Sequence, residues 1–368
     1  MLFINAIIAL QEVLDLKECT NTTDLNLGMI ASIGDSVLAG YGSRQFTAWP
    51  FFNPLNFRED RGATAVSGGD PDMWSMFRMA KYFNPDLQGE STGTHWINLC
   101  RGVLCVWPFN MYRKNDGLNV AETGAFTSDT MRQAKELVKR VNVIQKDKPA
   151  LRKKWKLVAF LVGLNDQFNA CNGYKSSLLY YDFYVREIIN YLRQNLEYVI
   201  IDVMSMWDLD GMVELSSKHP NCMNNNRQTM FKKMCSCPFD KKKGEEFRKG
   251  MKAYQVGQNK ILKTIVEEYQ NGTAWTKKEK LATSWLGKPS TFKLIYDPGA
   301  ENMDLTALPY TSLTNTDCSH PTMQMHERLA SSFWKNLFLS SKDKMTDQSW
   351  AFKSGYLKFT CPTTIKFD

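Results

Sequence analysis

The sequence predicts an α/β protein whose mainly parallel sheet is covered by helices on both faces. Three mainly apolar runs, at residues 29–33, 157–162 and 198–204, support this prediction. Strands that are buried on both faces read as continuous apolar runs. Segments with apolar residues at helical spacing separate the runs, and such alternation indicates βαβ units. With 368 residues and 43% hydrophobic content, the chain can bury a full core, and we expect one large domain with loop insertions.

A candidate nucleophile stands at the end of the first run. Residues 34–36 read Gly-Asp-Ser, and small residues and glycines then turn the chain. Ligands of open α/β sheets bind at the carboxyl ends of the strands, so Ser36 lies where a nucleophile is expected. The structural alternative is that Asp35 and Ser36 only begin a helix, as Asp and Ser often do. The tripeptide alone favours that alternative.

The next part of the chain is irregular. Residues 44–72 read as an insertion rich in Phe, Pro, Asn and Gly, and a helix is expected over residues 73–83. Residues 86–117 are loop-like and carry Cys100 and Cys105, which are close enough in sequence to form a short disulfide loop.

A strand, a glycine turn and a helix are expected next. Residues 118–121 are strand-like, and Gly124 follows in a turn. A helix from about residue 128 places one set of apolar residues on a single face, namely Met131, Ala134, Val138 and Val141.

The run at residues 157–162 ends in Gly-Leu-Asn-Asp, and a helix with apolar residues between 178 and 192 leads to the strand at 198–204. Residues 207–243 resemble a cysteine-bearing insertion. A long helix is expected over residues 245–269, and a polar stretch then leads to residues 292–296.

The last expected helix follows Asp-Cys-Ser-His at residues 317–320, with Pro321 in its first turn. It carries an apolar stripe of Leu329, Phe333 and Leu337. The tail after residue 340 is polar and ends in a short strand-like piece near Cys361.

A serine nucleophile needs a base, and His320 is the one histidine of four with a carboxylate three residues earlier. That carboxylate, Asp317, can bond the ring nitrogen that faces away from the serine, fix the tautomer and stabilise the imidazolium. The structural alternative is an Asp at a helix start, where Asp is common. Residues 317–320 alone do not decide between the two.

Acyl transfer also needs hydrogen-bond donors for the developing oxyanion. The strand-end turns offer the backbone N–H groups of Ser36 and Gly124 and the side-chain amide of Asn165. Gly124 and Asn165 also suit plain turn or cap positions. Their shared place at the carboxyl ends of predicted strands favours a role at the site. One GxSxG sequence occurs, at residues 89–93, but it lies in the loop-like segment 86–117 rather than between a strand and a helix, so it does not predict the nucleophile elbow of the α/β-hydrolases.

Four blocks in this order resemble the signature blocks of the GDSL or SGNH hydrolases. They read GDSV at 34–37, NVAETGA at 119–125, GLND at 163–166 and DCSH at 317–320. The first block has Val37 where the family pattern has Leu. Within the family, the chain looks most like the phospholipase B group, through residues 61–70 and 83–85 and the cysteines at 222, 235 and 237.

The resemblance implies a flavodoxin-like three-layer α/β/α fold. It also implies Ser36 as nucleophile, His320 as base and Asp317 as its orienter, with Ser36, Gly124 and Asn165 forming the oxyanion hole. The implied activity is hydrolysis of acyl esters of glycerophospholipids and lysophospholipids through an acyl-enzyme, without a metal or a cofactor. Two alternatives stay open: an esterase for short-chain or acetylated-carbohydrate esters, and a catalytically silent lipid-binding glycoprotein.

The balance of charge bears on partners. The net charge is +8 and the pI about 8.9, which permits attraction to anionic surfaces. With the aromatic residues between 46 and 57, this suits peripheral contact with a membrane surface, although those aromatics suit the core equally well. No zinc finger, RNA-binding signature or phosphate-binding glycine loop accompanies the basic runs, so nucleic acid is not expected as a partner.

The cysteines and glycosylation sequences bear on compartment. The nine cysteines are scattered rather than paired as CxxC, which argues against zinc and is compatible with disulfides. Acceptor triplets at Asn21 and Asn271 agree with a secreted protein or one in the secretory-pathway lumen. No apolar run reaches about 20 residues, so we expect no spanning helix. The expected division is residues 1–24 as a signal or N-terminal extension, 25–340 as a single hydrolase domain and 341–368 as a C-terminal extension.

Overall fold

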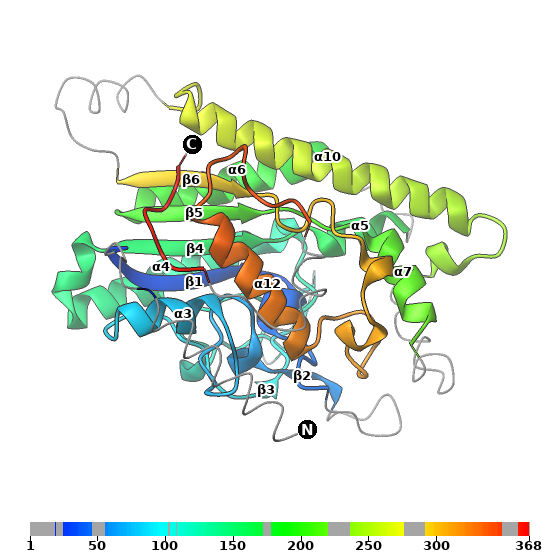
Figure 1. Cartoon of the computed structure of the whole chain (residues 1–368), viewed down its shortest axis with the longest axis horizontal. Helices are drawn as coiled ribbons and strands as arrows, with labels where there is room; N and C mark the ends of the chain where they lie inside the picture. The colour runs from blue at the N-terminus through cyan, green and yellow to red at the C-terminus, as the bar shows by residue number, and fades with distance from the viewer. Residues whose placement is uncertain are drawn as a thin grey trace.

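The centre of the fold is a parallel sheet of four strands in the order β1-β4-β5-β6 (Figure 1). The computed structural model describes residues 19, 25–45, 56–101, 104–107, 109–171, 178–219, 236–275, 291–347 and 360–367. The strands are β1 (Leu27–Gly34), β4 (Trp155–Leu161), β5 (Val199–Met204) and β6 (Phe292–Asp297). β1, β4 and β5 confirm the three strands expected from the apolar runs, whereas the sequence predicted no element at β6.

A further segment pairs with β1 on the side away from β4. Ser32 N donates to Leu118 O at 3.1 Å, and Val120 N donates to Ser32 O at 2.9 Å. Glu122 N continues the pairing to Gly34 O at 3.2 Å. The run expected as a strand over residues 118–121 therefore lies beside β1 through a single parallel bridge. This pairing brings the residues that follow it to the carboxyl end of β1.

Helices cover both faces of the sheet, which gives the three layers expected. The apolar residues of α3 (Met76–Phe83) and α12 (Met323–Asn336) join one core, and those of α4 (Thr130–Asp147) and α6 (Leu178–Asn195) join the other. In Figure 1, α12 lies in front of the sheet and α4 and α6 lie behind it. The long helix α10 (Gly244–Gln270) runs along the β6 side and packs on α6.

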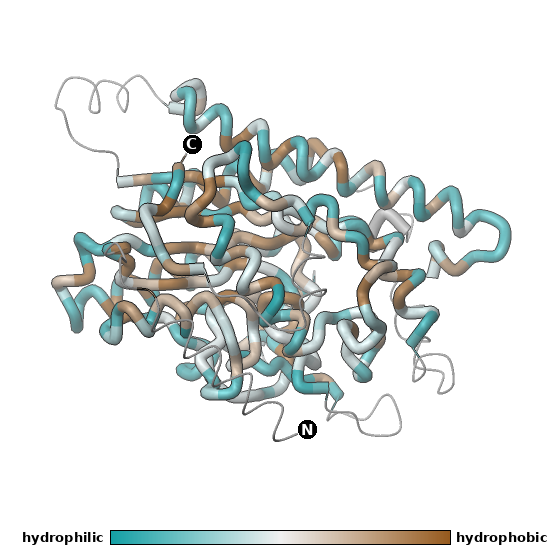
Figure 2. The backbone as a smooth tube through the Cα atoms, viewed as in Figure 1, coloured by the Kyte–Doolittle hydropathy of each residue, from teal (hydrophilic) through white to brown (hydrophobic). Residues whose placement is uncertain are grey.

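The strands contribute side chains to the cores on both faces of the sheet. In β1, Ile30 belongs to the core beneath α3 and α12, whereas its neighbours Met29 and Ala31 belong to the core beneath α4 and α6. Figure 2 shows the strands as hydrophobic along most of their length. The mainly apolar runs follow from this arrangement, because successive strand residues point to opposite faces and both faces are buried.

The smaller elements lie in the connections between the long strands and helices. They include α2 (Ser36–Ala39), α5 (Leu164–Cys171), α7 (Leu209–Ser217) and the short antiparallel pair β2 (Arg58–Glu59) and β3 (His95–Trp96). The 3₁₀ turns are η2 (Arg61–Ala63), η4 (Lys114–Asp116), η5 (Thr127–Asp129), η6 (Pro149–Lys153), η7 (Cys237–Phe239), η8 (Leu305–Ala307) and η9 (Tyr310–Ser312). Helix α7 lies inside the segment that the sequence indicated only as an insertion.

Two helix starts differ from expectation. Helix α3 begins at Met76 rather than at residue 73, because the Ser75 side chain caps it by accepting the N–H of Arg78 at 3.1 Å. Pro321 does not enter the first turn of α12. Thr322 is the N-cap of that helix, and Pro321 lies before it in an antiparallel bridge with Leu313.

The described C-terminal segment contains no strand, contrary to the piece expected near Cys361. Residues 360–367 instead pack against the domain. Trp334 Nε1 donates to Thr360 O at 2.7 Å, and Ile365 is buried. A disulfide joins Cys361 to Cys19, whose Cα atoms are 5.5 Å apart.

A second disulfide joins Cys100 to Cys105 and confirms the short loop expected there. Several expected features lie outside the described residues, namely the apolar stretch at 1–10, the triplet at Asn21, the aromatics between 46 and 52, Cys222 and Cys235. Among the helices that are described, none combines the length and the apolar character needed to cross a membrane.

Candidate active site

Ser36 is the first residue of α2, a one-turn helix at the carboxyl end of β1. Asp35 caps this helix, because its Oδ1 accepts the N–H of Val37 at 3.0 Å. Gly40 ends the helix with a left-handed φ of 77°, a conformation that glycine adopts without steric cost. Both interpretations of the Gly-Asp-Ser block therefore apply: the acid begins a helix, and the serine stands at a strand end.

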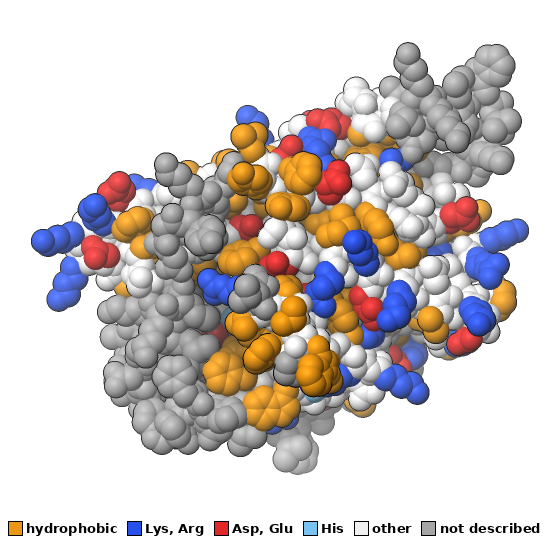
Figure 3. Space-filling model, turned by 180° about the vertical axis from the view of Figure 1, so that it is seen from behind, with side chains coloured by type: hydrophobic (Ala, Val, Ile, Leu, Met, Phe, Trp, Pro, Cys, Tyr) orange, Lys and Arg blue, Asp and Glu red, His pale blue; other side chains and the backbone are white. Residues whose placement is uncertain are grey.

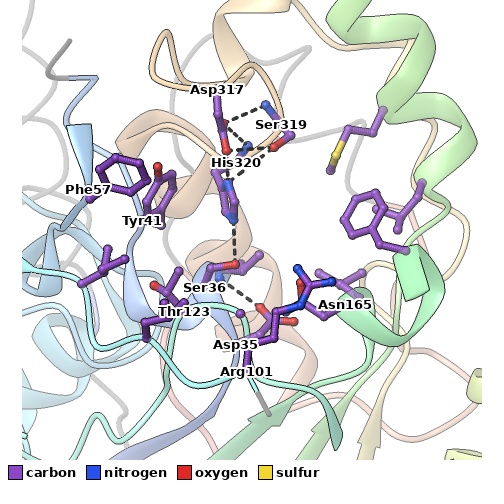
Figure 4. Close-up of a pocket in the computed structure, with 18 of the residues that line it drawn as sticks. Asp35, Ser36, Tyr41, Phe57, Arg101, Thr123, Asn165, Asp317, Ser319 and His320 are labelled. Carbon is purple, nitrogen blue, oxygen red and sulfur yellow. Dashed lines mark hydrogen bonds and ion pairs between the residues drawn. The ribbon is translucent and has the colours of Figure 1, made fainter. Parts of the chain in front are cut away.

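Ser36, His320 and Asp317 form one chain of hydrogen bonds (Figure 4). Ser36 Oγ lies 2.6 Å from His320 Nε2, and His320 Nδ1 lies 2.5 Å from Asp317 Oδ2. The Asp317 side chain is fully buried, whereas 16% of the His320 side chain is exposed. The fold thus joins two segments 284 residues apart into the order hydroxyl, imidazole, carboxylate.

The loop around Asp317 fixes the carboxylate. Its Oδ1 accepts the N–H groups of Ser319 at 3.0 Å and of His320 at 3.1 Å, and Ser319 Oγ donates to Oδ2 at 3.0 Å. Cys318 has a left-handed φ of 63° and is disulfide-bonded. The Tyr41 ring packs on the imidazole of His320, with ring centroids 4.7 Å apart. These contacts orient the imidazole toward Ser36.

Asp317 and His320 each stabilise the charged form of the other. Burial opposes the negative charge of Asp317, but the charge of His320 and the hydrogen bonds to the carboxylate outweigh it and lower the pKa of Asp317. Burial also opposes the positive charge of His320, yet the charge and hydrogen bond of Asp317 raise its pKa above the ordinary value. The site therefore favours an imidazolium beside a carboxylate, which is the state reached when a serine proton moves to histidine.

Three candidate oxyanion donors border the same cavity. Ser36, Gly124 and Asn165 all line it. Gly124 has a left-handed φ of 82° in the turn after the segment beside β1. Asn165 Nδ2 donates to Ala125 O at 3.0 Å, which orients the amide. Because a primary amide carries two N–H donors, this bond leaves a second N–H for a ligand.

A side chain of α4 holds the end of β1. Gln133 Oε1 accepts the N–H of Gly34 at 2.9 Å, and Gln133 Nε2 donates to Gly34 O at 2.8 Å. The Gln133 side chain is completely buried. Since Gly34 O also accepts the N–H of Glu122, this amide clamp ties the turn before Ser36 to the segment that leads to Gly124.

A buried ion pair bonds to the segment that leads to Gly124. Arg61 Nη2 lies 2.6 Å from Glu59 Oε2, and neither side chain is exposed. The guanidinium also donates to Asn119 O at 3.1 Å and to Ala121 O at 2.8 Å. Glu59 Oε1 accepts a hydrogen bond from the hydroxyl of Thr123 at 2.6 Å. The Arg61–Glu59 ion pair therefore holds the chain as far as the residue before Gly124.

Two buried carboxyl groups lie near the serine, and sequence reasoning predicted the raised pKa of neither. Burial raises the pKa of Asp35 to about 7, although the Val37 N–H opposes this, and its Oδ2 has no hydrogen-bond partner within the described residues. Burial likewise raises the pKa of Asp166 to about 6, and this group accepts the N–H and hydroxyl of Thr127 at 3.0 Å each. The signal was their position in buried strand-end turns beside Ser36 and Asn165.

The cavity in front of Ser36 has a volume of about 190 Å³ and is largely apolar. Its apolar lining is Val37, Phe57, Ile97, Leu99, Leu164, Phe168, Trp207, Leu209 and Met212. Arg101 is the only Arg or Lys among the described lining residues, and sequence reasoning gave it no role. Its guanidinium carbon lies 5.3 Å from the centroid of the Phe126 ring.

Metal-ligand geometry within the described residues occurs only for Cys100, Cys105 and Asp129. The two sulfurs are joined in a disulfide, so they offer no thiolate to a metal ion. This group is therefore not a candidate metal site.

The chain is similar to several known proteins. A family model described as GDSL-like Lipase/Acylhydrolase matches residues 30–333. "Phospholipase B1, membrane-associated" of Rattus norvegicus is 25% identical over 347 residues, which cover 92% of this chain and 21% of the rat protein. The Homo sapiens protein of the same name is 21% identical over 350 residues, with the same shares. The Mus musculus protein is 30% identical over 193 residues, or 51% of this chain and 11% of that protein. The chain thus spans about a fifth of the length of its rat and human relatives.

Proposed function

Because the chain belongs to the GDSL-like lipase/acylhydrolase family, we propose that it hydrolyses acyl ester bonds of glycerophospholipids and lysophospholipids. Family membership gives the class of reaction, which is ester hydrolysis. The single observation that carries the proposal is the hydrogen-bonded chain of Ser36, His320 and Asp317 at the wall of an apolar cavity.

In the proposed reaction, Ser36 Oγ attacks the ester carbonyl carbon while its proton passes to His320 Nε2. The carboxylate of Asp317 stabilises the imidazolium that results. The carbonyl oxygen becomes an oxyanion and accepts hydrogen bonds from the N–H groups of Ser36 and Gly124 and from the amide of Asn165.

Collapse of this intermediate breaks the bond to the glycerol oxygen, which takes the proton from His320. The fatty acyl group stays on Ser36 as an ester. Water then loses a proton to His320 and attacks the same carbonyl carbon. The fatty acid leaves, and its departure returns the proton from His320 to Ser36.

The cavity favours a lipid over a sugar. Its lining is apolar apart from the catalytic groups, Asp35, Thr123, Ser319 and Arg101, which suits an acyl chain better than an acetylated carbohydrate with many hydroxyl groups. Arg101 supplies a cation that can pair with the phosphate of a phospholipid. The names of the rat and human relatives point to the same class of substrate.

For the compartment, we propose the secretory-pathway lumen or the cell exterior. The disulfides Cys19–Cys361 and Cys100–Cys105 support this proposal, because disulfides persist mainly in oxidising compartments. Asn271 is exposed just after α10, where a glycan has room. Recovery of active, glycosylated protein from culture medium tests the proposal, and retention in the cytosol contradicts it.

Hydrolysis of dioleoyl phosphatidylcholine, its lyso form and an acetylated sugar tests the function directly. We expect fatty acid release from both lipids and a loss of at least about a thousandfold in Ser36→Ala. Ser43→Ala, which alters another buried serine on the same segment, is the matched control and should keep its activity. A fluorophosphonate probe followed by mass spectrometry should label Ser36.

Three results would contradict the proposal. Faster cleavage of the acetylated sugar favours the carbohydrate esterase. Full activity in Ser36→Ala, or labelling at another residue, removes the proposed nucleophile. Failure of wild type to cleave any of the three esters favours a silent lipid-binding protein.

A further inference from the structure

Exposed apolar side chains gather in one loop beside the cavity. We call residues 96–111 the rim loop, of which residues 102, 103 and 108 lie outside the described part of the chain. Six of its large apolar side chains are at least 37% exposed, and Trp107 reaches 76%. They are Trp96, Leu104, Val106, Trp107, Phe109 and Met111. On the face shown in Figure 3, hydrophobic side chains gather with Lys and Arg among them.

The rim loop is braced against the candidate active site. Two of its residues, Ile97 and Leu99, line the cavity. Leu99 N donates to Phe109 O at 3.0 Å, which holds the two halves of the loop side by side. Cys100 N donates to Thr123 O at 2.9 Å, next to Gly124. The exposed side chains therefore stand on the loop that forms one wall of the cavity.

Along the sequence, the charged residues of this region have a single sign, although Asp129 lies beside the Cys100–Cys105 disulfide and near Arg101. Residues 91–115 contain no Asp or Glu, and they contain Arg101, Arg113 and Lys114. Arg101 and Lys114 are exposed, and Arg101 also lines the cavity. The Cys100–Cys105 disulfide closes the turn that carries Arg101. Apolar and basic side chains thus share one surface at the rim.

We propose that the rim loop docks the protein on the surface of a phospholipid layer. This inference rests on the proposed function, and it adds which part of the protein contacts the lipid surface. Exposed apolar clusters of this kind mark contact sites, and Trp prefers the boundary between head groups and acyl chains. Exposed Arg and Lys side chains add attraction to anionic head groups.

Continuity with the cavity argues for a lipid surface rather than a protein. A protein partner seated on the rim loop would cover the side from which Ile97 and Leu99 reach the cavity. A lipid layer in the same place brings acyl esters to Ser36, because the ester groups of phospholipids lie just below the head groups. Insertion of Trp107 and Val106 then places the cavity at the depth of its substrate.

The test compares two double variants in vesicle binding. Val106→Ser with Trp107→Ser removes two exposed apolar groups of the rim loop. Val143→Ser with Tyr82→Ser is the matched control, because Val143 and Val106 are both 56% exposed and Tyr82 is an exposed aromatic at 46%. Tyr82 lies in the last turn of α3, and the residue that ends this helix, Asn84, donates from Nδ2 to Leu27 O at 2.7 Å. Tyr82 is therefore near the amino end of β1, at the opposite end of that strand from Ser36.

Binding is measured by sedimentation with vesicles of dioleoyl phosphatidylcholine and dioleoyl phosphatidylserine, in a Ser36→Ala background that leaves the lipid intact. Hydrolysis of the same vesicles and of soluble p-nitrophenyl butyrate is measured with Ser36 present. We expect the rim-loop variant to lose about tenfold in vesicle binding and in vesicle hydrolysis. Its hydrolysis of the soluble ester should stay within about twofold of wild type, and the control should keep all three properties.

Several outcomes overturn the docking surface. These are wild-type vesicle binding by the rim-loop variant, absence of vesicle binding by the parent protein, or an equal loss of soluble-ester hydrolysis. Self-association of wild type that the rim-loop variant abolishes would assign the surface to a second copy instead. These outcomes differ from those expected if the proposed function is wrong. In that case no ester would be cleaved, while vesicle binding could still be measured.

Discussion

Asp317 sets the pH at which His320 can accept a proton. The imidazole must be neutral at Nε2 to take the proton of Ser36, and the neighbouring carboxylate raises the pKa of His320 above its ordinary value. Activity should therefore fall as the pH drops through this raised pKa. The acid limb of the pH profile reports the pair rather than an isolated histidine.

Replacement of Asp317 by Asn should move that limb. Without the carboxylate the imidazolium loses its charge partner, so the pKa of His320 falls and the acid limb of kcat/KM shifts to lower pH. The amide also fails to hold the right tautomer, and kcat should drop by about 10³- to 10⁴-fold. A pH profile on a soluble ester measures both effects. Asp304→Asn, at an exposed cap, should leave the profile unchanged, and an acid limb that stays in place in Asp317→Asn would contradict the assignment.

Sequence reasoning at this scale named the candidate reacting groups that the structure brings together, because each follows a strand or forms a local pair. Asp317 and His320 are three residues apart, which made their partnership readable. Tyr41 and Arg101 were missed, because their places beside His320 and in the cavity depend on contacts between remote segments. Asp35 was assigned to turn geometry alone, since burial of its carboxyl depends on helices and strands packed around it.

At the scale of elements, α4 controls the geometry of the turn that carries Ser36. Gln133→Leu keeps the volume of the side chain but removes the only hydrogen-bond partner recorded for Gly34 N within the described residues. The buried N–H is left unpaired, which should lower the free energy of unfolding by about 1–3 kcal/mol. We also expect kcat on a soluble ester to fall, because the strand end before Ser36 loses its support.

Urea unfolding and steady-state kinetics measure these two effects. Gln145→Leu makes the same substitution on the same helix at a half-buried position and serves as the control. Unfolding of Gln133→Leu at the same urea concentration as the control would show that the amide clamp contributes little.

The sheet could be predicted from sequence because strands buried on both faces leave an unbroken apolar signature. Helices α4, α6, α10 and α12 were also expected, because each buries an apolar stripe, although α12 is buried on most sides and exposes no broad polar stripe. Helix α7 was not expected, since it lies in a segment where cysteines and turn residues dominate the pattern. The start of α12 was misplaced because Thr322 caps the helix and Pro321 pairs with a distant residue instead.

For the whole molecule, the Cys19–Cys361 disulfide should matter more to stability than Cys100–Cys105. The two bonds span 342 and 5 residues. In the chain-entropy view, a longer closed loop restricts the unfolded chain more, so loss of the long bond should cost about 5 kcal/mol and loss of the short one about 2 kcal/mol. Urea unfolding of the two double Cys→Ser variants measures the difference.

Hydrolysis of a soluble ester should continue in the variant without the Cys19–Cys361 bond. The segment that follows Cys361 packs at the amino end of β4, where the Phe367 and Trp155 rings are 6.3 Å apart, whereas Ser36 lies at the carboxyl end of β1. A larger loss of stability from the short bond, or loss of ester hydrolysis with the long one, would contradict this division.

The same long bond has a topological consequence. With the Cα atoms of Cys19 and Cys361 5.5 Å apart, the described chain comes into the fold and leaves it at one place. A unit built this way is modular: it can be spliced into a longer polypeptide or repeated on short linkers with no strand displaced. The short distance between Cys19 and Cys361 should also permit circular permutation, in which a peptide joins the two ends and the backbone is reopened in an exposed turn. Such a permuted protein would keep the strand order β1-β4-β5-β6 while reversing which partner, Ser36 or His320, is synthesised first.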